Sequence, residues 1–137
     1  MDKKTILFVD DDFLEHKKFE RALKKSDNPE LSIESFNDGS EALKWLESNK
    51  HAPPQLIILD LNMPLMNGLE LLELVKQDHY LKRIPVVILT TSKNPKDIEQ
   101  AHLLQAAGYI VKPNSNVQYQ DTIQLITQYW MTSQSVA

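Results

Sequence analysis

Four of the apolar runs in the sequence end in side chains that could act on a phosphoryl group. Asp10 and Asp11 follow the first of these runs, and Asp60 follows the second. Thr90 ends the third run, and Lys112 follows the fourth. Clustered carboxylates raise one another's pKa unless a cation lies between them. Mg²⁺ binds one or two carboxylates and keeps water or phosphate oxygens as its other ligands. An aspartate in such a cluster can attack phosphorus and form an aspartyl phosphate, while an ammonium and a hydroxyl group stabilise the phosphoryl oxygens.

The sequence places Asp60 at the carboxyl end of a buried strand. Four apolar residues at 56–59 are typical of a strand that is covered on both faces. Pro64 cannot continue a strand ladder, and Asn67-Gly68 indicates a turn before the next helical pattern. In open α/β sheets, ligands bind at the carboxyl ends of the strands. Asp60 therefore lies where a binding crevice is expected.

Strand and helix patterns alternate five times along the chain. The expected strands cover residues 5–9, 31–36, 56–59, 84–89 and 109–111, and the alternating run at 31–36 indicates an edge strand. The expected helices cover residues 13–25, a segment from about 40 that ends before Pro53, and 68–78, 95–107 and 117–131, with Gly108 as the stop of the fourth. This alternation predicts a single-domain, doubly wound α/β fold with a five-stranded parallel sheet in the flavodoxin-like order 2-1-3-4-5 and five helices. That order brings the ends of strands one, three and four into one crevice.

Composition narrows the classes of partner and compartment. The chain has 137 residues, a formal net charge of -4 and no cysteine, and its pI is about 5.5. This charge argues against nucleic acid or an anionic membrane surface as the partner. The short apolar run near the N-terminus does not fit a signal peptide, and no run reaches the length of a membrane span. We expect a cytoplasmic protein.

The chemistry-bearing residues together resemble a known family. Their order along the chain resembles that of the CheY-like receiver domains of two-component response regulators. The residues that carry this resemblance are Val9-Asp10-Asp11, Asp60 followed by Met63-Pro64 and Gly68, Thr90, and Tyr109 through Lys112-Pro113. The resemblance covers essentially the whole chain. It implies a protein that is not an enzyme but a phosphoacceptor, which catalyses its own phosphorylation and slow dephosphorylation.

The resemblance also implies roles for single residues. Asp60 would be the phosphoacceptor, Asp11 a direct Mg²⁺ ligand, and Asp10 a ligand acting mainly through a metal-bound water. Asn62 would offer its backbone carbonyl to the metal. Thr90, Thr91 and Lys112 would bind the phosphoryl group, although Thr91 is larger than the alanine or glycine common at its position.

Conformational signalling and partners follow from the same resemblance. Thr90 and Tyr109 match the switch pair of the family, in which the hydroxyl moves to the phosphoryl group and the aromatic ring turns inward. The bond between Lys112 and Pro113 is a candidate for a cis peptide bond. The phosphoryl donor would be a phosphohistidine on a sensor histidine kinase. Residues 81–85 and Tyr129-Trp130 are similar to stand-alone receivers that partner bacteriophytochrome-type kinases.

Two other functions fit part of the pattern. Asp10-Asp11-Asp12-Phe13-Leu14 is a near match to the nucleophile motif of haloacid-dehalogenase phosphatases, but Leu14 replaces the usual Thr or Val, and Asp60 would have no role. A pseudo-receiver that binds partners without phosphorylation is the second alternative. Asp12 alone fits a helix cap, and the four histidines show no metal-ligand spacing, so they are expected at the surface or in packing.

The last helix carries more apolar surface than docking requires. Tyr119, Ile123, Ile126 and Trp130 form a stripe that can pack on the sheet, and Leu125 and Tyr129 widen it. A broad core face explains this equally well as a homodimer surface formed with the Tyr109 strand. We expect a receiver domain over residues 1–131 and a flexible tail over 132–137, so output would pass through protein contact or onward phosphotransfer.

Overall fold

The computed structural model describes residues 4–25 and 30–132 and has one five-stranded parallel sheet in the order β2-β1-β3-β4-β5. The strands are β1 (Lys4–Val9), β2 (Leu31–Phe36), β3 (Leu56–Leu59), β4 (Val86–Thr90) and β5 (Gly108–Val111). The helices are α1 (Phe13–Lys24), α2 (Gly39–Ser48), α3 (Gly68–Gln77), α4 (Pro95–Leu103) and α5 (Asn116–Thr132), with a short 3₁₀ turn η1 (Leu81–Arg83). The predicted fold class and strand order are confirmed.

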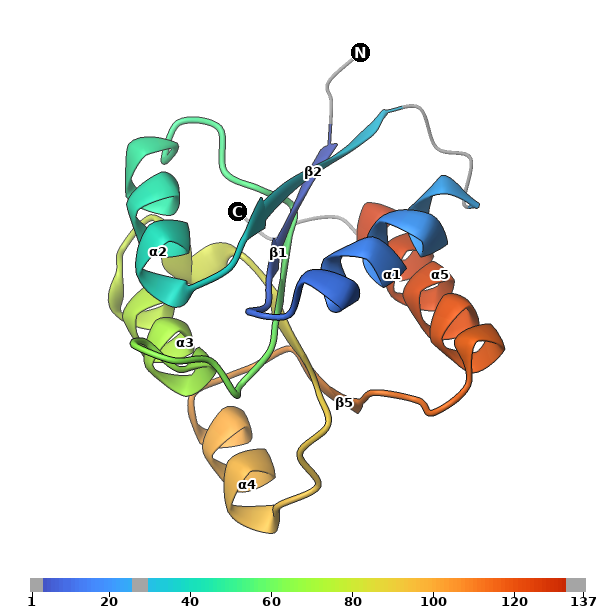
Figure 1. Ribbon diagram of the computed structural model, residues 1–137. Helices are drawn as coiled ribbons and strands as arrows, with labels where there is room; N and C mark the ends of the chain where they lie inside the picture. Colours follow the sequence, from blue (N-terminus) through green and yellow to red (C-terminus); the bar gives the residue numbers. More distant parts are fainter. Residues whose placement is uncertain (1–3, 26–29, 133–137) are drawn as a thin grey trace.

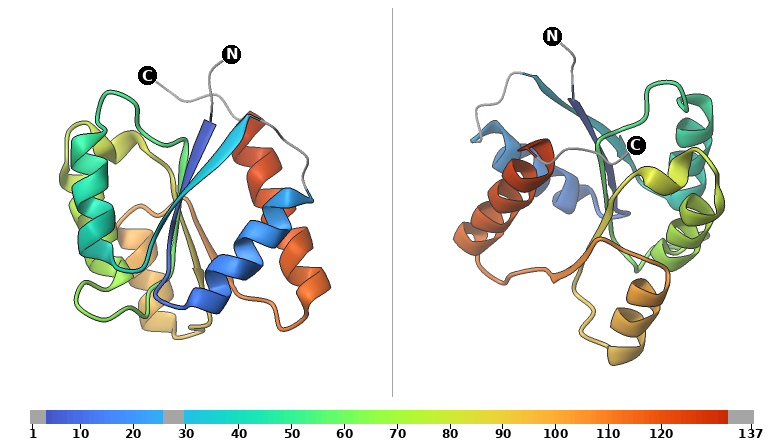
Figure 2. Two further views of the ribbon diagram at one scale, coloured as in Figure 1. Left: turned by 45° about the horizontal axis from the view of Figure 1, so that its top comes forward. Right: turned by 180° about the vertical axis from the view of Figure 1, so that it is seen from behind.

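The sheet lies between two layers of helices (Figures 1 and 2). Helices α1 and α5 cover one face, and α2, α3 and α4 cover the other. Alternate residues of the central strands therefore enter different cores: Ile58 packs with Phe19 and Ile123, whereas Leu59 packs with residues of α2 and α3. This two-sided burial explains the continuous apolar runs of β1, β3 and β4.

Two element boundaries differ from the sequence prediction by two residues or more. Strand β4 begins at Val86, because residues 81–83 form η1 and Ile84 follows it as a cap. Helix α4 ends at Leu103 and not just before Gly108. The amides of Gln105 and Ala106 donate to the carbonyls of His102 and Ala101, with Gln105 in the left-handed region at a φ of 68°. This is a Schellman ending in which glutamine takes the place usually held by glycine.

The C-terminal part of the chain follows the prediction within the described residues. Helix α5 includes Thr132, one residue beyond the expected end; the rest of the predicted tail, 133–137, lies outside the described residues. Tyr119 and Ile123 are buried against the sheet, whereas Leu125 and Tyr129 are 68% and 63% exposed. Over residues 4–25 and 30–132, no helix is long and apolar enough to cross a membrane.

Candidate phosphoryl site at the carboxyl edge of the sheet

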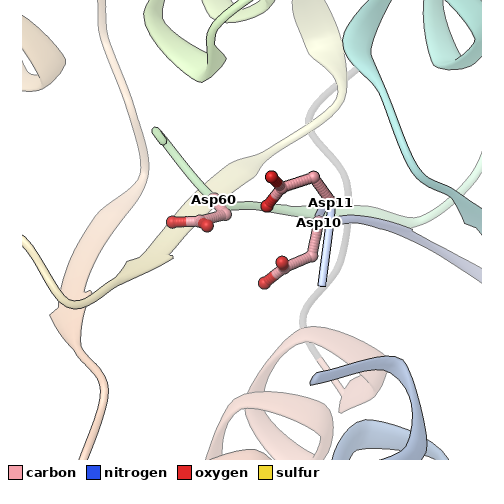
Figure 3. Close-up of side chains that lie close together, drawn as sticks. All are labelled: Asp10, Asp11 and Asp60. Carbon is pink, nitrogen blue, oxygen red and sulfur yellow. The ribbon is translucent and has the colours of Figure 1, made fainter. Parts of the chain in front are cut away.

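Three carboxylates meet where β1 and β3 end (Figure 3). Asp10, Asp11 and Asp60 each have a carboxylate oxygen within 4.8 Å of those of the other two. Asp10 and Asp60 are buried, while Asp11 is exposed. In the part of the chain that the structure describes, this is the one group of three such side chains with metal-ligand spacing. Oxygen ligands of this kind suit a hard divalent cation.

The parallel register of the sheet brings these residues together. Val9 of β1 pairs with Leu59 of β3, and the Asp60 amide donates to the Val9 carbonyl at 3.0 Å. The next residues along the two strands therefore leave the sheet side by side. Asp12 then begins α1 by accepting a hydrogen bond from the Leu14 amide at 2.9 Å, which confirms its predicted role as the helix cap.

A glycine allows the following helix to approach Asp60. The Gly68 amide donates to the Leu61 carbonyl at 3.1 Å, and a Cβ on Gly68 would lie 2.2 Å from the Asp60 carbonyl oxygen. The Asp60 side chain is itself held by the Leu61 amide, which donates to its Oδ1 at 2.8 Å. Asn67 caps α3 by accepting from the Glu70 amide. The start of α3 is thus packed against the backbone that carries the Asp60 carboxylate.

Lys112 enters the same site from the end of β5. Its Nζ lies 2.9 Å from Asp10 Oδ2, 3.4 Å from Glu15 Oε1 and 3.9 Å from Asp60 Oδ2. Its backbone amide donates to the Thr90 carbonyl at 2.8 Å, which fixes the end of β5 beside the end of β4. The structure thus brings Lys112 to Asp10 and Asp60, as the sequence predicted.

Burial and charge act in opposite directions at this site. Burial disfavours the charged form of Lys112, but the carboxylates of Asp10, Asp60 and Glu15 outweigh it and raise the pKa of Lys112. Burial raises the pKa of Asp10, against the Asp12 amide and Lys112, which favour its ionised form. An added divalent cation would relieve the repulsion between Asp10 and Asp60.

Glu15 is the site residue that the sequence analysis missed. It lies in the first turn of α1, where a glutamate is expected simply because it favours the helix dipole. Its side chain is only 14% exposed and forms an ion pair with Lys112. The available signal was the helical periodicity: Glu15 precedes the buried Phe19 by four residues, so the two side chains share one face of α1.

The two residues of the predicted switch are linked through Ser92. Thr90 is fully buried, and its Oγ1 accepts a hydrogen bond from the Ser92 amide at 3.3 Å. The Tyr109 hydroxyl donates to the Ser92 carbonyl at 2.9 Å. Ser92 also donates its hydroxyl to Asp97 in the first turn of α4 at 2.6 Å. A change at Thr90 therefore has a direct route to both Tyr109 and α4.

The remaining predicted residues lie at the rim or in packing. Thr91 and Asn62 are exposed, and Asn62 lines a cavity of about 440 Å³ beside α4. Among the histidines, His16 is buried, packs on Phe8 and donates from Nε2 to the Asp10 carbonyl at 2.7 Å. His16 is thus a packing residue, one of the two roles expected for the histidines.

The predicted cis peptide bond between Lys112 and Pro113 is wrong. Every peptide bond in residues 4–25 and 30–132 is trans. The trans form of a bond before proline is intrinsically favoured by about 0.5–1 kcal/mol. The ion pair between Lys112 and Asp10 forms with this trans bond in place.

Comparisons with known proteins agree on one family. The model of the response regulator receiver domain matches residues 6–124. The chain is 36% identical over 133 residues to the response regulator Rcp1 of Synechocystis, with 93% of this chain and 89% of Rcp1 covered. It is 35% identical over 102 residues to the probable methanogenesis regulatory protein FilR2 of Methanothrix harundinacea, with 72% of this chain and 66% of FilR2 covered.

Solved structures of the same family superpose closely. The phosphorylated cyanobacterial phytochrome response regulator RcpA matches with a TM-score of 0.91 and 33% identity, covering 98% of this chain and 99% of RcpA. The Mn²⁺-bound form of Rcp1 matches with a TM-score of 0.87 and 34% identity, again covering 98% and 99%. A divalent cation is thus found in a relative with this fold, and the three carboxylates here form a group of the kind that holds one.

Proposed function

Because the chain belongs to the response regulator receiver domain family of two-component signalling, we propose that it accepts a phosphoryl group on Asp60. The observation that carries this proposal is the convergence of three carboxylates and one buried ammonium around the end of β3. The phosphoryl donor is a phosphohistidine of a sensor kinase. The new bond joins phosphorus to an Asp60 carboxylate oxygen, and the bond that breaks joins phosphorus to the donor imidazole.

Mg²⁺ is the proposed cofactor. Asp11 and Asp60 would hold it directly, Asp10 mainly through a bound water, and Asn62 through its backbone carbonyl. When bound, the metal supplies positive charge that offsets the carboxylates and the phosphoryl oxygens. Magnesium favours oxygen ligands and retains waters, which fits a site where one of the three carboxylates is exposed to solvent.

The protein's own groups stabilise and position the transferred group. Lys112 lies 3.9 Å from Asp60 and can donate to one phosphoryl oxygen. The Thr90 hydroxyl accepts from the Ser92 amide and can donate its own proton to another phosphoryl oxygen. Thr91 lies at the rim of the site. Phosphoryl transfer depends mainly on such positioning and charge stabilisation.

The switch uses the hydrogen bonds around Ser92. When Thr90 turns its hydroxyl to the phosphoryl group, its bond with the Ser92 amide changes, and Ser92 also binds Tyr109 and Asp97. The position of Tyr109 and the start of α4 would therefore report phosphorylation. The signal passes to a partner protein that contacts Tyr109 and the start of α4, or it passes on by onward phosphotransfer.

Two partners are proposed. The likeness to RcpA, described as a phytochrome response regulator, supports a phytochrome-type sensor kinase as donor, and the chain would act in the cytoplasm. A second copy of this chain is the proposed partner of α5 and the Tyr109 strand. Leu125 and Tyr129 are exposed on α5, and Tyr109 lies on edge strand β5. Exposed aromatic residues of this kind are enriched in protein interfaces.

The test is phosphorylation of the intact chain by acetyl phosphate with Mg²⁺. Intact mass should rise by about 80 Da, one phosphoryl group, and the label should map to peptide 56–64. Asp60→Asn should abolish the label, while the exposed Asp121→Asn serves as the matched control and should label as the wild type does. A label lost in Asp10→Asn but kept in Asp60→Asn would indicate the phosphatase alternative. Absence of any label would indicate the pseudo-receiver.

A further inference from the structure

We infer that Glu15 is a positioning residue of the phosphoryl site, whose negative charge strengthens cation binding and opposes the phosphoryl group by competing for Lys112. The inference rests on the proposed function of Asp60. It concerns a residue that lies on α1, outside the three carboxylates that could hold a metal.

Glu15 and Asp60 both lie within 4 Å of the same ammonium group, that of Lys112. Glu15 Oε1 is 3.4 Å from Lys112 Nζ, closer than Asp60 Oδ2 at 3.9 Å. The Lys112 side chain is 7% exposed, so few waters can replace these partners. A phosphoryl group on Asp60 would therefore compete with Glu15 for the Lys112 ammonium.

The charge of Glu15 is incompletely neutralised. Its Oε2 is buried and has no hydrogen-bond partner. Among the side chains that the structure describes, the Tyr119 hydroxyl is the one other buried polar atom without a partner. Lys18, its other cationic neighbour, is 3.8 Å away, is 35% exposed and also lies over the Tyr119 ring at 4.8 Å. Burial raises the pKa of Tyr119, and the charges of Glu15 and Asp10 raise it further. The field of Glu15 therefore extends into the neighbouring interior.

The carboxylate of Glu15 is close enough to Asp60 for its charge to act on ligands of the site. Because Glu15 Oε1 and Asp60 Oδ2 both lie within 4 Å of the same nitrogen, they are no more than roughly 7 Å apart, inside the Debye length of about 8 Å at physiological salt. A negative charge at this range attracts a cation held by the carboxylates and repels a phosphoryl dianion. Competition for Lys112 adds to the second effect.

Two opposed changes distinguish this role from a structural one. In Glu15→Gln, which preserves size and removes the charge, the Mg²⁺ dissociation constant should rise. At saturating Mg²⁺, the dissociation constant for beryllofluoride should fall. Each change should be on the order of three- to tenfold, the range expected for one partly buried charge pair. Damage to packing would instead weaken both ligands together.

The experiment titrates the full chain with Mg²⁺ alone and then with beryllofluoride, following the backbone amide resonances of Leu61 and Thr90. Glu20→Gln, on the same helix and without an ion pair in the described residues, removes the same charge away from Lys112 and should match the wild type. Glu15→Asp, which retains the charge, should lie between the wild type and Glu15→Gln in both titrations.

Three results would overturn the inference. Glu15→Gln could match Glu20→Gln for both ligands, it could bind both more weakly, or Glu15→Asp could shift as far as Glu15→Gln. If wild-type protein binds Mg²⁺ but not beryllofluoride and gains no phosphoryl mass, the proposed function fails and the inference falls with it. That result is distinct, because it appears before any variant is compared.

Discussion

Replacing Gly68 by alanine should displace the backbone of Asp60, the proposed phosphoacceptor. The added Cβ would lie 2.2 Å from the Asp60 carbonyl oxygen and 2.9 Å from the Leu61 Cα. An ordinary contact begins near 3.4 Å, so α3 and the end of β3 must separate by about 1 Å. Both neighbours are backbone atoms, and no side-chain rotation can relieve the overlap.

The cost follows from this geometry. Overpacking in a well-packed site typically costs 1–3 kcal/mol, and we expect about 2–4 kcal/mol here because only backbone can move. For a domain of this size the melting temperature should fall by about 10 °C. A misplacement of about 1 Å at a reacting group can slow a reaction about 100-fold. The rate of phosphorylation should thus fall further than the loss of folded protein explains.

The assay combines urea unfolding with the rate of labelling by acetyl phosphate at saturating Mg²⁺. Gly108→Ala is the matched control, since the nearest atoms to its Cβ are Val87 methyl groups at 3.9 Å. That variant should have wild-type stability or slightly more, because alanine restricts the unfolded chain. Equal stabilities for the two variants, together with a wild-type labelling rate for Gly68→Ala, would refute the reasoning.

Two further predictions concern the periphery of the molecule. Hydrogen bonds from Lys50 and from the Leu81 amide lower the pKa of Asp78 to about 2. A carboxylate with a depressed pKa stabilises the folded protein above about pH 4, and this contribution is lost as the pH falls towards 2. In urea titrations at pH 7, the unfolding free energy of Asp78→Asn should be about 0.5–1 kcal/mol lower than that of the wild type. This difference should vanish near pH 2. For the α5 surface, sedimentation equilibrium at micromolar concentration should show a dimer that Leu125→Glu dissociates, and a wild-type monomer both with and without beryllofluoride would exclude the dimer.

The parts of the site that the sequence predicts are those fixed by strand ends. The apolar runs determine where β1, β3 and β4 end. Because the strands are parallel, the residues that follow these ends lie close together, as the hydrogen bond from the Asp60 amide to the Val9 carbonyl illustrates. Asp10, Asp60 and Lys112 are therefore found by reading the chain alone. The doubly wound fold follows from the same alternation of strands and helices.

The parts that the sequence does not predict depend on side chains meeting between elements. Glu15 looks like an ordinary first-turn glutamate until the rotation of α1 brings it to Lys112. The end of α4 was misplaced because Gln105, and not a glycine, adopts the left-handed conformation there. Ser92 gave no sign in the sequence that its amide, carbonyl and hydroxyl would join Thr90, Tyr109 and Asp97.

These two classes of residue have different consequences for function. In the proposed function, the strand-end residues bind the cation and the phosphoryl group, and their positions are set by the sheet. Residues contributed by helices, such as Glu15, can be substituted without disturbing the sheet. Such a substitution changes how strongly Lys112 interacts with its other carboxylate partners. Asp10 is already paired with Lys112 at 2.9 Å. The additional carboxylate of Glu15 should therefore change the relative affinities for the metal and for the phosphoryl group. It should not change which residue is the proposed acceptor, Asp60. Under the proposed function, the lifetime of the phosphorylated state should therefore depend on α1, whereas its formation should depend on the residues at the ends of β1, β3 and β5.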